Sequence, residues 1–190
     1  QTLYSRGTGG PAFAEGPEGL VVRSNTVTGP MAGISILAPS EGLIEGNDIS
    51  STGIGLRVAA AFSGSIEGNA VHDSSTGLSY EAPAATSGNR IYGNTVGAVV
   101  TVPGDIEGFG FVGDASPNEI YGNGVGVRLE GGRMQGQHIH DNTGAGVTGT
   151  GILGGNDLHH ANVIEGHSAG VADFTGTVQF NRIAENTTGI

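Results

Sequence analysis

The chain repeats a short pattern in which an aliphatic residue is followed by two spacers, an Asn and, soon after, another aliphatic residue. Clear copies occupy 44–49, 66–71, 91–96 and 120–125. The eight positions of the recurring polar residue are Asn25, Asn47, Asn69, Asn94, Asn123, Asn142, His167 (where Asn is expected) and Asn186. The copies lie 19 to 29 residues apart, and apolar residues show no helical spacing. This combination predicts a solenoid whose units bury their apolar sides against their neighbours.

Short runs of alternating aliphatic residues, bounded by Gly, Asn, Asp, Ser or Thr, predict short strands. Each repeat carries two of them: one in the Asn pattern and one that follows a Gly, as in 33–36, 55–58 and 126–129. A weaker third strand is expected over 151–153 and 177–180. One strand of each kind per coil predicts an all-β fold, a parallel β-helix of roughly eight coils spaced about 4.8 Å apart. In it the inward aliphatic residues stack in columns, and the Asn amides form a ladder from coil to coil.

We expect the β-helix repeats to occupy 19–190, after an N-terminal lead-in or partial coil over 1–18. The last residues, Thr188, Gly189 and Ile190, fall in the middle of a repeat. An open solenoid end exposes apolar core and strand edges. The sequence therefore predicts a segment of a longer rod, with adjoining β-helix coils or partner chains at its open ends.

Charge narrows the range of partners. The chain has 18 acidic and 7 basic residues, a net charge of −11, and no Lys. Binding to nucleic acid requires clustered cations, and docking on an anionic membrane does too, so neither is expected. No apolar run approaches the roughly 20 residues that a membrane-spanning helix needs, so membrane insertion is not predicted. The absence of Cys excludes disulfides and a thiol nucleophile.

The Ile-x-Gly-Asn-x-Ile…Gly-Ile-x-Val pattern, carried from about Gly19 to Ile190, resembles the right-handed parallel β-helix repeats of the CASH/NosD-like family of carbohydrate-binding proteins and sugar hydrolases. The resemblance implies a right-handed β-helix that is secreted, periplasmic or on the cell surface. It also implies a structural role or binding to a polysaccharide or cell-surface glycan. Because the family includes polysaccharide lyases and mannuronan C5-epimerases, an enzyme acting on acidic glycans is one alternative. A building block of a surface filament or layer is another.

Several motifs of the enzymes in this family are missing. Neither the Asn-Thr-Asp, Asp-Asp, Gly-His-Gly and Arg-Ile-Lys motifs of polygalacturonase-type members nor the Asp-Pro-His core of epimerases occurs. The catalytic candidates that remain are Tyr121, Arg128 and His140, with Tyr or His as the base and Arg as the partner of a uronate carboxylate. Stacked Glu45 and Glu67 offer a glycosidase-type carboxylate pair, or simply a charged surface that discourages association. The sequence leaves activity undecided and favours a non-catalytic segment.

Outward positions of the strands provide the carbohydrate-binding candidates. The residue after the leading aliphatic runs Glu45, Glu67, Tyr92, Tyr121, His140 and Glu165, which predicts one column. In that column Tyr92, Tyr121 and His140 form an aromatic strip that stacks on sugar rings or, alternatively, a ladder of rings that contact one another. On the second strand, Arg57 and Arg128 are candidates for binding the carboxylates of an acidic glycan, or are solvated residues of an acidic rod.

The longest step, between Asn94 and Asn123, predicts a loop that projects from the rod and contains Phe109 and Phe111. Its carboxylates Asp105, Glu107 and Asp114 are candidate ligands for Ca²⁺. The sequence indicates no other cofactor.

Six polar residues close together form a last candidate cluster: His138, His140, Asp141, His159, His160 and His167. His138 and His140 point to the same face of a strand, and a neighbouring coil can bring His159 or His160 close to them. Such a cluster suits a transition metal or acid–base chemistry. The alternative is that the cluster is no site at all and that His167 simply fills the place of a ladder Asn.

Overall fold

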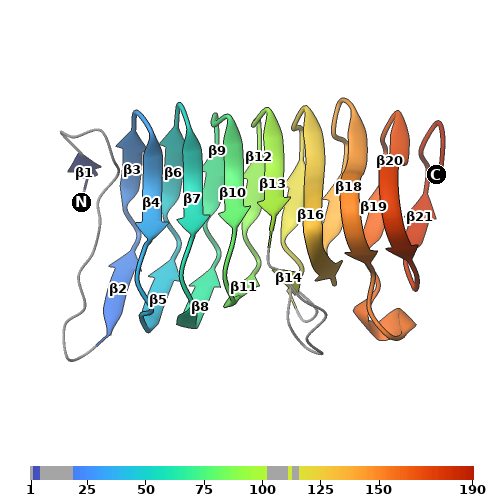
Figure 1. Cartoon of the computed structure of the whole chain (residues 1–190). Coiled ribbons are helices and arrows are strands. Elements are labelled where there is room, and N and C mark those ends of the chain that lie inside the picture. The colour runs from blue at the N-terminus through green and yellow to red at the C-terminus, as the bar shows by residue number, and fades with distance from the viewer. Residues whose placement is uncertain (1, 5–18, 102–110, 113–115) are drawn as a thin grey trace.

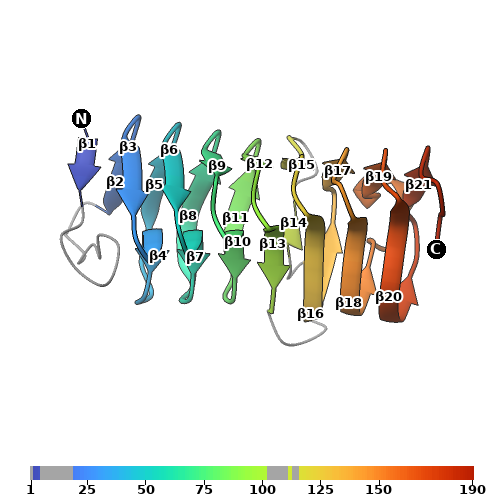
Figure 2. The ribbon, with the colours of Figure 1, turned by 90° about the horizontal axis from the view of Figure 1, so that it is seen from above.

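The computed structural model describes residues 2–4, 19–101, 111–112 and 116–190. Within them the chain winds into a parallel β-solenoid of about 7 turns (Figure 1), close to the roughly eight coils predicted. The fold class predicted from the repeat is therefore confirmed. β1 and β21 lie at opposite ends of the rod, and Figure 2 shows the same stack of coils from above.

The strands of the described residues form three parallel sheets that run along the rod. The first sheet contains β1 (Thr2–Tyr4), β3 (Thr26–Gly29), β6 (Asp48–Ser51), β9 (Ala70–His72), β12 (Arg90–Tyr92), β15 (Glu119–Tyr121), β17 (His138–His140), β19 (Val163–Glu165) and β21 (Arg182–Ala184). The second contains β4 (Ala32–Ile36), β7 (Ile54–Val58), β10 (Thr76–Tyr80), β13 (Val96–Val100), β16 (Val125–Gln135), β18 (Ala145–Leu153) and β20 (Ala169–Val178), with β14 (Phe111–Val112) beside β16. The third contains β2 (Leu20–Arg23), β5 (Gly42–Glu45), β8 (Phe62–Glu67) and β11 (Ala84–Ser87).

The separate third strand expected over 151–153 is not formed. These residues end β18, a single strand that continues around the corner from the second sheet, and β16 and β20 are long in the same way. Glycines with positive φ, Gly131 and Gly149 among them, occur along these long strands. The pairing of β16 with β18 shifts register between Glu130 and Arg133, as at a β-bulge, which bends a strand without ending it.

The core consists of aliphatic columns that run the length of the rod. In the first sheet the central residues of the strands from β3 to β19 are each at most 1% exposed: Val27, Ile49, Val71, Ile91, Ile120, Ile139 and Ile164. The second sheet adds a parallel column of residues such as Leu56 and Val127. Each coil buries its apolar side against the coils above and below, as the repeat predicts.

A column of glycines explains why the strands of the second sheet follow a Gly. Its members are Gly33, Gly55, Gly77, Gly97, Gly126, Gly146 and Gly170. A Cβ at any of them would lie 2.4 to 2.9 Å from the carbonyl oxygen of a glycine in the adjacent coil. Real Cβ atoms do not approach backbone oxygen so closely, so no other residue fits without moving the coils apart.

One 3₁₀ helix, η1 (Leu158–His160), interrupts the stack between β18 and β19. The Asp157 side chain caps it by accepting hydrogen bonds from the backbone N–H groups of His159 and His160, at 2.9 and 3.2 Å. No helix of the described residues is long and apolar enough to cross a membrane.

Candidate functional site

Two ladders of polar side chains, one on each side of the first sheet, connect the coils. The ladder before the strands comprises Asn25, Asn47, Asn69, Asn89, Asn118, Gln137, Asn162 and Asn181. The ladder after the strands comprises Ser51, Ser74, Asn94, Asn123, Asn142, His167 and Asn186. At a typical rung the backbone N–H and the Nδ2 group of Asn94 both lie 3.0 Å from Oδ1 of Asn123. The structural role predicted for the Asn residues is confirmed, but there are two ladders and not one.

The sequence pattern merges these two ladders into one apparent repeat. Asn47 and Asn69 belong to the first ladder, whereas Asn94 and Asn123 belong to the second. Both turns are built alike, with a residue of positive φ followed by the ladder residue: Gly46 has φ 60° and Gly93 has φ 66°. Glycine adopts this conformation without a steric penalty, so both turns favour Gly-Asn.

This correction changes which outward residues share a column. Glu45 and Glu67 lie on the third sheet, so they do not continue the strip of Tyr92. Glu45 pairs with Arg23 at 2.6 Å, and Glu67 accepts a hydrogen bond from Ser65 at 2.7 Å. The column of the first sheet instead runs Thr28, Ser50, His72, Tyr92, Tyr121, His140, Glu165 and Ala184.

Aromatic rings in this column form a continuous stack, here called the ring stack: His72, Tyr92, Tyr121, His140 and, beside it, His138. Consecutive ring centroids are 5.1, 5.4, 5.0 and 4.4 Å apart, and the planes meet at 30° or less. The adjacency predicted for Tyr92, Tyr121 and His140 is confirmed, whereas His72 was missed. The alternation Ala70-Val71-His72, with an outward residue after the buried Val71, is the signal that identifies it. Each inner ring has both faces against a neighbour, so its edge is what remains for solvent.

Carboxylates fix the two imidazoles that bracket the tyrosines. His72 lies between Asp48, 2.6 Å from Nε2, and Asp73, 2.8 Å from Nδ1. Burial is the largest single influence on the pKa of His72 and lowers it, but the hydrogen bonds and charges of the two carboxylates together outweigh it, so the pKa is raised. His140 has Asp141 at 2.9 Å from Nδ1.

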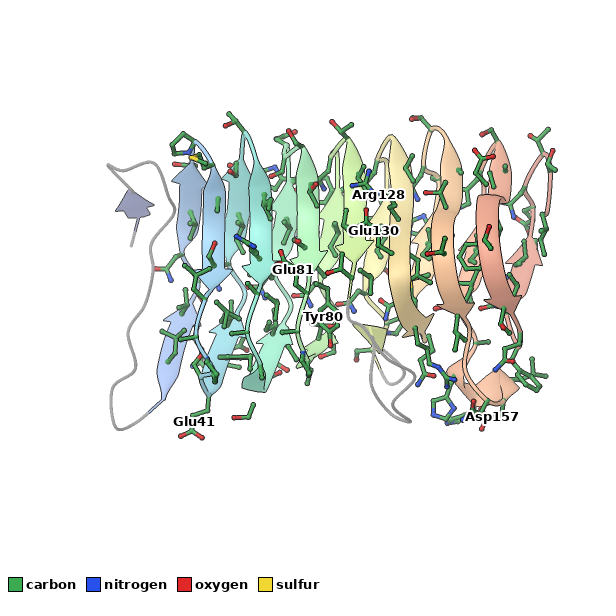
Figure 3. The ribbon with its side chains drawn as sticks, in the orientation of Figure 1. Glu41, Tyr80, Glu81, Arg128, Glu130 and Asp157 are labelled. Atoms are coloured by element: carbon green, nitrogen blue, oxygen red, sulfur yellow. The ribbon has the colours of Figure 1, made fainter. Side chains whose placement is uncertain are left out.

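The two candidate arginines lie on the second sheet and are paired with carboxylates. Both oxygens of Glu81 accept from Arg57, at 2.8 and 2.9 Å, and this hydrogen bonding is the main reason why the pKa of Glu81 is lowered. Arg128 donates to Glu130 at 2.8 Å, and both residues lie on β16 (Figure 3). The structure thus brings Tyr121 and His140 together and places Arg128 on a different sheet.

His167 takes the place of an amide in the second ladder and is 3% exposed. Its Nδ1 accepts from the backbone N–H of Asn142 at 3.2 Å, and its Nε2 lies 3.2 Å from the carbonyl oxygen of Ile139. These partners require the neutral tautomer with the proton on Nε2. Burial is the main reason why the pKa of His167 is lowered. The hypothesis that His167 fills a ladder place is confirmed.

The long step before Asn123 contributes little to the described structure. The calcium candidates Asp105, Glu107 and Asp114, together with Phe109, lie outside the described residues. Phe111 begins β14, whose backbone pairs with β16 next to Met134.

A pocket of about 380 Å³ opens at the corner before the first sheet. It is lined by Pro117, Gly136, Gln137, His138, His159, Ala161, Val163 and Glu165. His138 and His159 therefore line the same pocket, whereas His167 lies in the second ladder. We call this the corner pocket.

The described side chains do not form a metal centre. No group of three or more His, Cys, Asp or Glu among them is arranged to hold a metal ion. At His72, which has Asp48 and Asp73 beside it, both imidazole nitrogens are already hydrogen-bonded to carboxylate oxygens. Cys is absent from the chain, and of its two Met residues Met134 is fully buried in the core and Met31 is exposed. The donor set thus lacks the converging nitrogen and sulfur ligands that copper prefers.

Comparison of the chain with known proteins identifies its family. Residues 3–106 match the family described as periplasmic copper-binding protein (NosD), and this match covers more than half of the chain. No curated protein and no solved structure matches the chain. The family is periplasmic, which confirms the predicted location in the secreted, periplasmic or cell-surface class. From its repeat, its β-solenoid and this match, the chain belongs to the NosD family of right-handed parallel β-helix proteins.

Proposed function

We propose that this extracellular β-helix module has a structural role, as a stiff rod that spaces or presents other parts of its protein. The proposal rests on the two polar ladders. At nearly every corner beside the first sheet, a polar side chain is hydrogen-bonded to a neighbouring coil. Repeated polar residues that bind their own neighbours stabilise the stack of coils and are not free to bind a ligand.

The geometry of the other outward residues supports the same proposal. The ring stack covers the faces of its inner rings, and a sugar stacks on the face of a ring, not on its edge. Arg57 and Arg128 each pair with a glutamate, so an acidic glycan would have to displace that carboxylate from a surface of net negative charge. A lyase or epimerase that acts on acidic glycans, with Tyr121, Arg128 and His140 as its residues, is the less favoured function, because these three side chains do not face one site.

We further propose that adjoining β-helix coils are the partners of the rod. The register of the first sheet supports this proposal: successive strands pair in parallel with their central residues opposite one another, as Ile164 and Ile183 do. A coil that carries Ile or Val in the inward column and Asn in the ladder column would make the same contacts.

The copper named in the description of the family is not part of the proposal. The described side chains do not offer converging ligands for it, as shown above. We therefore assign no metal chemistry to these residues.

The test is incubation of the purified chain with uronic-acid polysaccharides, followed by measurement of unsaturated ends, of the epimer ratio and of co-sedimentation. A structural rod leaves the polymers unchanged and does not sediment with them. New unsaturated ends or an altered epimer ratio would establish the enzyme instead, and retention on the polymer would establish binding to acidic glycans. Concentration-dependent end-to-end assembly of the chain alone, measured by analytical ultracentrifugation, would assign the filament role.

A further inference from the structure

We propose that the outward face of the first sheet binds a second copy of the chain, side by side and with the two rods antiparallel. This pairing goes beyond the structural role, because it uses the side of the rod and not its ends. Two columns of outward side chains build the face (Figure 2). One column contains the ring stack. The other, here called the Arg90 column, lies at the start of β9, β12, β15 and β17 and runs Ala70, Arg90, Glu119 and His138.

The centre of this face is neutral and aromatic, although the chain as a whole is strongly acidic. The outward positions of β9, β12, β15 and β17 carry one Arg and one Glu, so their charge sums to zero with His counted as neutral, against −11 for the whole chain. Tyr and Arg are enriched at the centre of protein interfaces, and net charge is depleted there. Asp73 and Asp141 lie at the edge of the face with side chains 77% and 75% exposed, where water and salt screen their charge.

The order of the rings is symmetric about a point between β12 and β15. Along the rod the order His72, Tyr92, Tyr121, His140 gives the same residue types from either end. A two-fold interface needs a surface that complements itself, with residue i against residue j and j against i. When two antiparallel rods meet about an axis at this point, Tyr92 faces Tyr121 of the second copy, and His72 faces its His140.

The same axis brings unpaired opposite charges together. Arg90 and Glu119 are exposed, and within the described residues neither has an ion-pair partner, although they are neighbours in register on β12 and β15. An axis between these strands places Arg90 against Glu119 of the second copy, and Glu119 against its Arg90. Two parallel rods would instead place Arg90 against Tyr92 of the second copy. Because complementary charges fix the register of an interface, the antiparallel arrangement is favoured.

Two further features fit this arrangement. The hydroxyl groups of Tyr92 and Tyr121 have no hydrogen-bond partner in the part of the chain that the structure describes. A phenol both donates and accepts, so these two groups can bind each other across the axis. Ala70 has the smallest outward side chain of the four strands, and the axis places it opposite His138 of the second copy. A short side chain thus meets a bulky one.

The size of the face predicts a weak dimer. Nine strands about 4.8 Å apart, each about three residues wide, give a face of roughly 400 Å². Stable pairs bury about 800 Å² on each partner. The charge of −11 on each copy also opposes association, and salt screens this repulsion. We therefore expect a Kd of about 10–500 µM at physiological ionic strength.

The experiment is analytical ultracentrifugation of the full chain from about 10 µM to about 1 mM in about 0.15 M salt. We expect an equilibrium between monomer and dimer. Arg90→Glu and Glu119→Arg should each weaken the dimer at least about tenfold, because each brings like charges together at two symmetric places. An equimolar mixture of the two variants should associate like the wild type, because in the mixed dimer opposite charges meet at both places.

Arg128→Glu and Glu130→Arg are the matched controls, because they make the same changes of charge in an ion pair on the second sheet. Alone or mixed, they should dimerise like the wild type. Tyr121→Phe keeps the ring but removes two hydroxyl contacts from the dimer, so it should weaken the dimer about three- to tenfold. Circular dichroism shows that each variant is folded.

Three results would overturn the pairing. The wild type could remain monomeric up to about 1 mM. It could form an open series of larger species, which would indicate end-to-end assembly instead. The mixture of Arg90→Glu and Glu119→Arg could associate no better than either variant alone, or the controls could lose the dimer equally, which would exclude this face and this register. The presence or absence of the dimer leaves the structural role as it is, since that role is tested with polysaccharides.

Discussion

His167 contacts Asn142 in the way that Asn142 contacts Asn123: a side-chain acceptor on one coil meets the backbone N–H of the coil before it, at 3.2 and 2.9 Å. Nε2 of the same imidazole faces the carbonyl oxygen of Ile139, the role that Nδ2 of Asn142 has toward Ile120. An imidazole thus imitates an amide, with one important difference: the imidazole can take up a proton.

Because His167 can take up a proton, we predict that low pH destabilises the fold. Burial lowers the pKa of folded His167, whereas in the unfolded chain its pKa is near the ordinary 6.5. As the pH falls below this value, the unfolded state binds more protons than the folded state does. The free energy of unfolding therefore decreases below about pH 6.5, whereas above this pH the protonation of His167 does not reduce it. His167→Asn should lose less stability than the wild type between about pH 7.5 and 5, as measured by urea unfolding.

The comparison between the two proteins isolates His167. His72, whose raised pKa acts in the opposite direction by stabilising the fold at low pH, is present in both, as are Asp141 and His140 near the imidazole. If the free energy of unfolding of the wild type and of His167→Asn changed in parallel across this pH range, His167 would not titrate in the way its burial requires.

The sequence predicts the fold well because the same physical requirement recurs in every coil. It does not separate the two ladders, because both corners need the same pair of residues, one with positive φ and one with an amide. The segment 88–94 contains the clue: Gly88-Asn89 and Gly93-Asn94 stand five residues apart, too close to belong to successive coils. Assigning Asn89 to the first ladder places Tyr92 after His72 and not after Glu67.

Other parts of the site depend on contacts that no periodicity encodes. The pairing of Arg57 with Glu81, or of His138 with Glu165, joins residues 24 and 27 positions apart through side-chain conformation. The corner pocket depends on η1, whose residues interrupt the repeat and so have no counterpart in neighbouring coils. The sequence indicated histidines in this region, but not the apolar corner of Pro117, Gly136 and Ala161 that they face.

The glycine column should tolerate no side chain. In Gly97→Ala the new Cβ would lie 2.5 Å from the carbonyl oxygen of Gly126, so the coils must separate locally. We expect a loss of about 1–3 kcal/mol in the free energy of unfolding, typical of overpacking, measured by chemical denaturation. Gly189→Ala, which meets no atom within 4 Å, is the control and should change stability by less than about 0.5 kcal/mol. Equal effects of the two substitutions would contradict the close packing of the column.

The ring stack should contribute to stability through ring contacts and not through hydroxyl groups. Tyr121→Ala removes contacts with Tyr92 and His140 and should cost roughly 1–3 kcal/mol, since each aromatic pair contributes about 0.5–1.5 kcal/mol beyond burial. Tyr121→Phe keeps the stack and should remain close to the wild type. Thermal unfolding of the two variants measures the difference. A Phe variant as unstable as the Ala variant would refute the ring contacts as the cause.

Addition of copper should have little effect on the folded chain. A metal held by the native state at about 100 times its Kd would raise the free energy of unfolding by about 2.7 kcal/mol. Because the described residues lack a converging donor set, we expect the unfolding midpoint to stay the same with Cu²⁺ in molar excess. A saturable rise in the midpoint, abolished by His138→Ala or His72→Ala, would instead reveal a copper site made from these imidazoles.

The most direct test of the central claim, that the repeated polar residues bind coil to coil, is a double-mutant cycle on Asn94 and Asn123. Nδ2 of Asn94 donates to Oδ1 of Asn123 at 3.0 Å, and both side chains are buried. The account predicts that Asn94→Ala and Asn123→Ala each lower the free energy of unfolding by about 1–3 kcal/mol, and that the double variant shows a coupling of about 0.5–3 kcal/mol. Strictly additive losses, or single variants as stable as the wild type, would contradict it.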